Sequence, residues 1–163
     1  MKSGDVIAVC AIVVAVVSLG VSIMQGRAVR RHERNSVRPL LQLHRVVRHS
    51  GRTGVRLVNS GLGPAIVTQS MMCLDGAQVG SWDSAVAARL QAELALQFSY
   101  VTFNETEVLA PAAERYPLSV KKFAPQDHGH FLELIDHRIG IQIHYQSLYG
   151  ETFMVTLSPK PAS

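Results

Sequence analysis

The sequence contains seven histidines, and three of them, late in the chain, suggest metal chemistry. His128 and His130 lie two residues apart, and His137 follows them. Imidazoles two apart on an extended segment project to one side, so this pair with Glu133 or His137 could ligate zinc or a related metal. No Cys pair, His-Glu-x-x-His motif or Asp-rich loop accompanies them, so a solvated loop is favoured and no metal site is assigned.

No pattern typical of a catalytic centre is found in the sequence. There is no G-x-S-x-G nucleophile elbow, and Gly61-Leu62-Gly63 precedes a predicted strand where a nucleotide-binding motif should open a helix. The acidic residues are few and scattered, so no acid–base pair is nominated. Cys73 lies among Met71, Met72 and Leu74, which favours a small buried hydrophobe over a nucleophile. We predict that the protein is not an enzyme and holds no cofactor.

One long apolar stretch near the N-terminus has the length and composition of a membrane anchor. Val6 to Met24 contains no charge, no amide and no proline. As a helix rising about 1.5 Å per residue it spans roughly 28 Å, close to the ~30 Å hydrocarbon core of a bilayer. Its most polar members, Ser18 and Ser22, can bond back to the preceding turn. The stretch predicts one transmembrane helix over residues 6–25.

Basic residues gather after this stretch rather than before it. Only Lys2 precedes it, with Asp5 against it. The positive-inside rule then predicts a cytoplasmic C-terminal domain and an N-terminus outside. The arginines that follow the stretch can contact anionic lipid headgroups. Nucleic-acid binding is not expected, because no aromatic residues are interleaved with them. The predicted membrane-surface residues are Arg27, Arg30, Arg31 and Arg34.

Two alternatives concern the same stretch. The positive-inside rule is a bias, so an envelope-facing domain with the opposite topology stays open. Small residues recur four apart at Ala11 and Ala15 and at Ser18 and Ser22, a spacing that lets two helices approach closely. A homodimer through the anchor is therefore an additional expectation, beside contact with the lipid bilayer.

From Val37 onward the sequence changes to short alternating runs, as β-strands do. Residues 81–96 instead show a helical period, with Ser81 or Asp83 able to cap the start, and 126–136 can form another short helix. The order predicts a mainly-β, immunoglobulin-like antiparallel sandwich with one or two inserted short helices. The predicted strands cover residues 37–47, 54–60, 65–74, 116–123, 139–145 and 151–157.

Two turns are the candidate interaction loops. In the first, Gly61 and Gly63 permit positive φ and close strand approach, and Pro64 fixes φ as the next strand begins. The second is the SLYG turn between the last two strands. We expect these loops, or unpaired strand edges, to contact an unidentified protein partner. The candidate loop residues are Asn59, Gly61, Gly63, Pro64 and Tyr149.

Three motifs follow the anchor and its Arg/His-rich flank: SVRPL at 36–40, NSGLGPA at 59–65 and IHYQSLYGE at 143–151. In this order they resemble a group of small bacterial proteins with one N-terminal membrane helix and an immunoglobulin-like β-sandwich domain. The N-x-G-x-G-P-A turn also resembles bacterial adhesion-type immunoglobulin-like domains. The resemblance supports the fold and brings no catalytic residue. Together with the predicted anchor and its basic flank, it implies a bacterial inner-membrane location. Independently of it, the Tyr145 hydroxyl is expected to bond a nearby backbone group.

Together these patterns predict a single-pass membrane protein that presents a cytosolic β-sandwich as an interaction or assembly module. A membrane-tethered metal-binding enzyme or sensor that uses the late histidines is the alternative. The predicted parts are an N-terminal tail 1–5, the transmembrane helix 6–25, a basic juxtamembrane segment 26–36, the β-sandwich 37–158 and a flexible tail 159–163.

Overall fold

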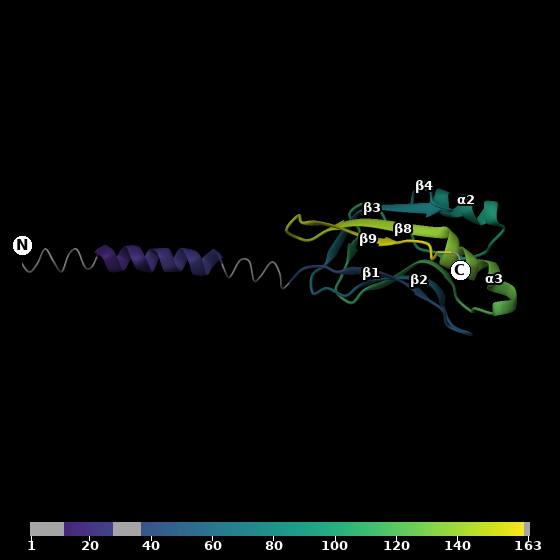
Figure 1. The fold of residues 1–163 in the computed structure, drawn as a ribbon, viewed down its shortest axis with the longest axis horizontal. Coiled ribbons are helices and arrows are strands. Elements are labelled where there is room, and N and C mark those ends of the chain that lie inside the picture. The colour runs from purple at the N-terminus through teal and green to yellow at the C-terminus, as the bar shows by residue number, and fades with distance from the viewer. Residues whose placement is uncertain (1–11, 28–36, 162–163) are drawn as a thin grey trace, which may run out of the picture. The chain divides into compact units, whose positions relative to one another are not determined.

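The computed structural model describes residues 12–27 and 37–161 (Figure 1). The chain divides into two compact units, Met1–Val37 and Arg38–Ser163.

In the first unit, residues 12–27 are α-helical. The large apolar side chains of this helix are all exposed, by 46% to 71%. Ser22 Oγ donates a 2.8 Å hydrogen bond to the Ser18 carbonyl oxygen, the back-bonding expected from the sequence. Residues 6–11 of the predicted span, and Arg30, Arg31 and Arg34 of the basic flank, lie outside the described residues. Within the described part of the chain, no helix is both long and apolar enough to cross a membrane.

The second unit is an antiparallel β-sandwich with inserted helices, which confirms the predicted mainly-β class. One sheet has the strand order β1-β2-β7-β5, and the other has the order β4-β3-β8-β9 with β6 also paired to β3. The strands are β1 Leu41–Val46, β2 Thr53–Asn59, β3 Ala65–Leu74, β4 Ala77–Ser81, β5 Ser99–Tyr100, β6 Val108–Leu109, β7 Glu114–Val120, β8 Ile139–Gln146 and β9 Thr152–Leu157.

The two-residue period of the strands builds the core between the sheets. In β8, Ile141, Ile143 and Tyr145 are buried, whereas Gln142 and His144, which alternate with them, are half-buried. The same alternation drives one face of each strand inward, because burying apolar surface is the main favourable term in folding. From the two sheets, the core includes Leu41, Val55, Leu57, Leu118, Val67, Met72, Ile141 and Ile143.

Helix α2, Ser84–Leu94, closes one side of the core between β4 and β5 (Figure 1). Its N-terminus is capped by Asp83, whose side chain accepts a 2.8 Å hydrogen bond from the Val86 amide. Of the two caps that the sequence suggested, Asp83 is therefore the one used. Trp82, just before the cap, is buried and its indole N–H donates to the Val101 carbonyl at 2.8 Å. The tryptophan thus fixes the start of the helix to the β-structure.

A second helical segment lies between β7 and β8, as the sequence predicts. It consists of α3, Pro125–Glu133, followed by a π-helical turn, Leu134–Arg138. Phe131 and Ile135 are buried in the core. The wider π turn ends the helix directly at the first residue of β8.

The sequence missed the shortest strands, and the reason is physical. β5 and β6 are two residues long, too short to show any alternation. β4 is an edge strand that contains Gly80, and its pairing with β3 shifts register between Met72 and Cys73. Such strands form because a neighbouring strand provides backbone hydrogen-bond partners, and their own sequences show little preference for β-structure.

Candidate functional site

The two loops that the sequence singled out lie at the same end of the sandwich. Loop 60–64 joins β2 to β3, and loop 147–151 joins β8 to β9. They are neighbours because β3 pairs with β8, with Ile66 opposite Gln146. The segment 38–40 enters β1 at this end too, since β1 and β2 pair antiparallel. We call this region the hairpin end, after the β8–β9 hairpin that projects from it (Figure 1).

Asn59 holds the hairpin end together from inside. Its Oδ1 accepts hydrogen bonds from the amides of Leu40 at 3.2 Å and Gly61 at 3.0 Å. Its Nδ2 donates to the carbonyl oxygens of Gly63 at 2.8 Å and Leu109 at 3.0 Å. The side chain is fully buried. Asn59 is therefore a brace that fixes the loop, and its polar atoms do not face outward.

Gly61 is required by close packing of two backbone segments. A Cβ at this position would lie 2.4 Å from the Arg38 carbonyl oxygen and 2.4 Å from the Leu40 amide nitrogen. Neither Gly61 nor Gly63 adopts a positive φ. Of the two reasons that the sequence offered for these glycines, close approach is the one that operates at Gly61.

The hairpin turn is braced in a similar way by Ser147. Its Oγ, buried, accepts hydrogen bonds from the amides of Tyr149 at 3.2 Å and Glu151 at 3.3 Å. Gly150 takes φ +78°, in the left-handed region that glycine adopts at little cost. Leu148 and Tyr149 are thereby held at the tip, both exposed.

Tyr145 ties the two sheets together just below the loops. Its hydroxyl accepts a hydrogen bond from the Leu41 amide at 3.3 Å, which confirms the backbone bond expected for this tyrosine. Its ring packs against Phe153 with centroids 5.5 Å apart, and the Arg38 guanidinium lies 4.7 Å from the Phe153 ring centroid. A cation–π contact therefore fixes the first residue of the domain against β9.

Apolar side chains project from this braced end. Leu62 at the tip of the first loop is 76% exposed, and Leu148 at the tip of the hairpin is 63% exposed. Leu40 and Val108 are exposed beside them. No Asp, Glu, Lys or Arg occurs in loop 60–64 or at positions 147–150. The hairpin end thus presents a rigid apolar surface, and neither loop brings together groups that could perform acid–base or nucleophilic chemistry.

A second surface, which the sequence did not reveal, is an open cleft of about 440 Å³ on the first sheet. Next to the lining residue Ser119, β2 and β7 approach closely: Gly54 pairs with Ser119, and a Cβ on Gly54 would lie 2.1 Å from the Leu118 carbonyl oxygen. The lining residues come from separate parts of the chain, so no local motif marks them. They are Arg52, Ser99, Tyr100, Val101, Glu114, Arg115, Tyr116, Ser119 and Lys121.

The cleft is basic and aromatic. Glu114 is paired with Arg56 at 3.1 Å, and Arg115 with Glu107 at 3.7 Å. Lys121 has no ion-pair partner within residues 37–161, and Arg52 lies 4.8 Å from the Tyr116 ring centroid. Lys121 and Arg52 could therefore bind the carboxylates of an acidic ligand.

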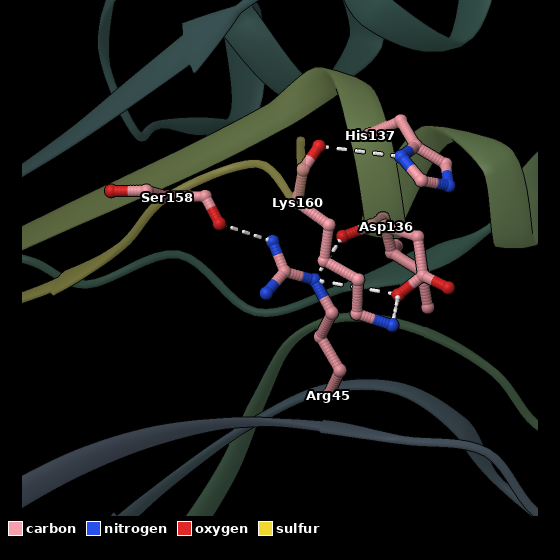
Figure 2. Close-up of polar contacts among 6 residues, drawn as sticks. Arg45, Asp136, His137, Ser158 and Lys160 are labelled. Atoms are coloured by element: carbon pink, nitrogen blue, oxygen red, sulfur yellow. Dashed lines mark hydrogen bonds and ion pairs between the residues drawn. The ribbon is translucent and has the colours of Figure 1, made fainter. Parts of the chain in front are cut away.

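A third polar cluster fastens the chain end at the opposite end of the sandwich (Figure 2). Arg45 Nε donates to the Ile135 carbonyl at 2.5 Å, and its Nη2 donates to the Ser158 carbonyl at 2.6 Å. Asp136 Oδ1 lies 3.6 Å from Arg45 Nε and 2.8 Å from Lys160 Nζ. Both contacts are ion pairs without hydrogen-bond geometry. Burial lowers the pKa of Arg45, and the Asp136 carboxylate opposes that shift. The cluster is a structural clamp.

The clamp also involves the predicted tail. The sequence predicts a flexible tail from residue 159, and in the structure the Lys160 amide donates to the Asp136 carbonyl at 2.7 Å. A ring nitrogen of His137 lies 3.3 Å from the Lys160 carbonyl oxygen. These contacts hold Lys160 against the π-helical turn Leu134–Arg138.

The late histidines take separate positions. His128 Nδ1 can accept a 3.1 Å hydrogen bond from the Ala124 amide. His130 Nδ1 lies 3.9 Å from a carboxylate oxygen of Glu133. His137 contacts the chain end instead. Among residues 12–27 and 37–161, no group of His, Cys, Asp and Glu side chains is arranged to hold a metal ion.

No protein-family model matches the chain, and no curated protein matches its sequence. The functional argument therefore rests on the geometry of the hairpin end and the cleft.

Proposed function

We propose that the protein is a single-pass membrane protein whose N-terminal helix, Val6 to Met24, anchors a β-sandwich that acts as an interaction module. The observation that carries the proposal is the exposure of the helix. Its large apolar side chains between residues 12 and 24 are all at least 46% exposed. A helix that is apolar on every side is stable in lipid, whereas in water it exposes its apolar surface at a cost.

The proposed orientation puts the sandwich in the bacterial cytoplasm and the N-terminus outside. Support comes from the arginines that follow the apolar stretch, Arg27, Arg30, Arg31 and Arg34. A reporter fused to the C-terminus that is active only in the cytoplasm tests this orientation. Activity of an export-dependent reporter at the same position would favour the envelope-facing alternative.

We also propose that the sandwich is of immunoglobulin-like type. The strand orders β1-β2-β7-β5 and β4-β3-β8-β9 support it, because they correspond to the ABED and C′CFG sheets of that fold. Two antibody-domain features differ. Cys73 is a free cysteine on β3, and the buried Trp82 precedes α2 instead of lying on β3.

The proposed partner surface is the basic cleft beside β5, and the proposed partner is a protein with an acidic extended segment. β5 ends its sheet, and no strand of the described residues pairs with its outer edge, where a partner strand could add. Arg52, Tyr100 and Tyr116 belong to the residue types enriched at the centres of protein interfaces. The late histidines, by contrast, lend no support to the metal-binding alternative within the described residues.

The experiment compares partner recovery by full-length variants isolated from membranes. A protein that copurifies with the wild type should be lost from R52E/K121E and retained when Val6–Met24 is replaced by another apolar helix. The matched control is R89E/K122E, which makes the same change in net charge at two residues that do not line the cleft. Equal loss from both double variants, or retention by both, would overturn the assignment of the cleft.

A further inference from the structure

We propose that the hairpin end is a lipid-docking surface: Leu62 and Leu148 insert into the headgroup region of the membrane that holds the N-terminal helix. This inference rests on the proposed anchoring and deepens it, because it assigns the occupant of one face of the sandwich. It also separates two surfaces, with lipid at the hairpin end and protein at the basic cleft.

The first argument is the chemistry of the loop tips. Leu62 and Leu148 are the most exposed large apolar side chains of the sandwich unit, at 76% and 63%. Each lies at the tip of a turn, and the two turns flank the paired strands β3 and β8. Apolar tips on neighbouring loops can enter the acyl boundary together, about 5–10 Å deep, as amphipathic surfaces do.

The second argument is rigidity. Asn59 closes the first loop through its hydrogen bonds to Gly61 and Gly63, and Ser147 closes the hairpin through the Tyr149 and Glu151 amides. Because both backbones are already fixed, insertion of the tips requires little further ordering of the loops. Exposed apolar groups on braced loops are typical of a surface that binds something.

The third argument is connectivity, which selects lipid as the occupant. Only residues 28–36 separate the described N-terminal helix from Val37, and the chain enters the sandwich at the hairpin end. A fully extended segment of that length reaches roughly 32 Å, at about 3.6 Å per residue. If the helix is in the bilayer, the segment that tethers the sandwich to it attaches at the hairpin end.

The fourth argument is charge. Besides the uncharged loop tips, the segment that leads into this end is basic, with Arg30, Arg31, Arg34 and Arg38. Basic residues next to an anionic membrane surface attract it. The nearest acid to the tips in sequence is Glu151, at the base of the hairpin, whose carboxylate lies 3.5 Å from Ser147 Oγ. The apolar tips with a basic flank fit an anionic lipid surface.

The test places a single new tryptophan at each tip of the full-length protein, reconstituted in vesicles of phosphatidylethanolamine and phosphatidylglycerol. The variants are L62W and L148W, and the probe is the same lipid with bromine on its acyl chains, which quenches tryptophan on contact. The native Trp82 is 1% exposed and supplies a constant background. The matched control is V47W, because Val47 is also exposed and follows β1 at the end of the sandwich away from the loops.

The proposal predicts that brominated lipid removes about half of the added emission of L62W and L148W and about a tenth or less of that of V47W. If all three variants resist quenching while the protein stays in the vesicles at alkaline pH, the docking proposal is wrong and the anchoring stands. Equal quenching of V47W would also overturn it. A blue-shifted but unquenched L148W would assign the surface to a second copy of the chain. Failure of the chain to enter vesicles would overturn the anchoring itself.

Discussion

The Asn59 carboxamide donates a 2.8 Å hydrogen bond to the Gly63 carbonyl oxygen, and this contact closes the loop that carries Leu62. The same side chain accepts from the Leu40 amide, so it joins the loop to the segment through which the chain enters the sandwich. One buried amide therefore fixes both parts of the hairpin end. The exposed apolar tip depends on a polar residue that never reaches the surface.

Replacing Asn59 should destabilise the sandwich strongly. Asn59→Ala leaves the carbonyls of Gly63 and Leu109 unpaired in a buried site and removes the acceptor of the part-buried Leu40 and Gly61 amides, which should cost on the order of 2–4 kcal/mol of unfolding free energy. Denaturant unfolding of the full-length protein in detergent measures it. The control is Asn104→Ala at an exposed position, which should change stability by less than about 0.5 kcal/mol. Equal effects of the two substitutions would contradict the brace.

Gly61 should tolerate no side chain. In Gly61→Ala the new Cβ would lie 2.4 Å from backbone atoms of Arg38 and Leu40, so one strand connection must shift, at a cost of about 2 kcal/mol or more. Thermal unfolding tests it against Gly129→Ala, where no atom lies within 4 Å of the new Cβ. The Gly129 variant should melt at or slightly above the wild-type temperature, because alanine favours the α3 helix more than glycine does. A Gly61 variant that did likewise would show that the close approach is not required.

The clamp around Arg45 should hold the chain end. Arg45→Ala removes the donors to the Ile135 and Ser158 carbonyls and leaves Asp136 with Lys160 alone, so amide hydrogen exchange at Lys160 should accelerate by roughly tenfold or more. The control is Arg89→Ala, which breaks an exposed helical ion pair with Glu93 and should leave that exchange rate unchanged. Unchanged exchange in the Arg45 variant would show that the tail is held by other contacts.

The ion pair between Asp75 and Arg138 should give a small acid-dependent contribution to stability. Hydrogen bonds from Arg138, at 2.8 and 2.6 Å, hold the pKa of the Asp75 carboxyl below its ordinary value. A lowered folded-state pKa stabilises the fold above the unfolded value of about 3.9, and the contribution disappears as pH falls through the folded-state pKa.

The substitution that isolates this contribution is Asp75→Asn, because asparagine also accepts the φ of +51° found there. It should lower unfolding free energy by less than about 1 kcal/mol at pH 7, since the pair is exposed. The difference from wild type should shrink on acidification below about pH 4. A difference that stays constant down to pH 2 would rule out the ion pair as its source.

How much of this fold could be read from the sequence depended on the length of each element. β8 alternates over Ile139–Gln146 and was predicted almost to the residue, and the Asp83 cap of α2 was among the expected ones. β5 and β6 escaped detection because two residues carry no period. Their position depends on the ladders that β7 and β3 offer.

Of the two candidate surfaces, the hairpin end could be predicted in part from the sequence, and the basic cleft could not. The loop containing Asn59 and Pro64 is marked by its glycines and proline, which are local signals. Its sequence could not show that the Asn59 side chain is buried while Leu62 is exposed, because that depends on contacts with Leu40 and Leu109 far along the chain. The basic cleft is assembled from β5, β7 and the segments that flank them in space, including Arg52 just before β2, so only the sheet topology reveals it.

The most direct test of the central claim is alkaline carbonate extraction of membranes that contain the full-length protein, compared with a chain lacking residues 1–27. The account predicts that the full-length chain stays in the membrane pellet and that the truncated chain is released. Release of the full-length chain into the supernatant would contradict the anchored module and everything proposed from it.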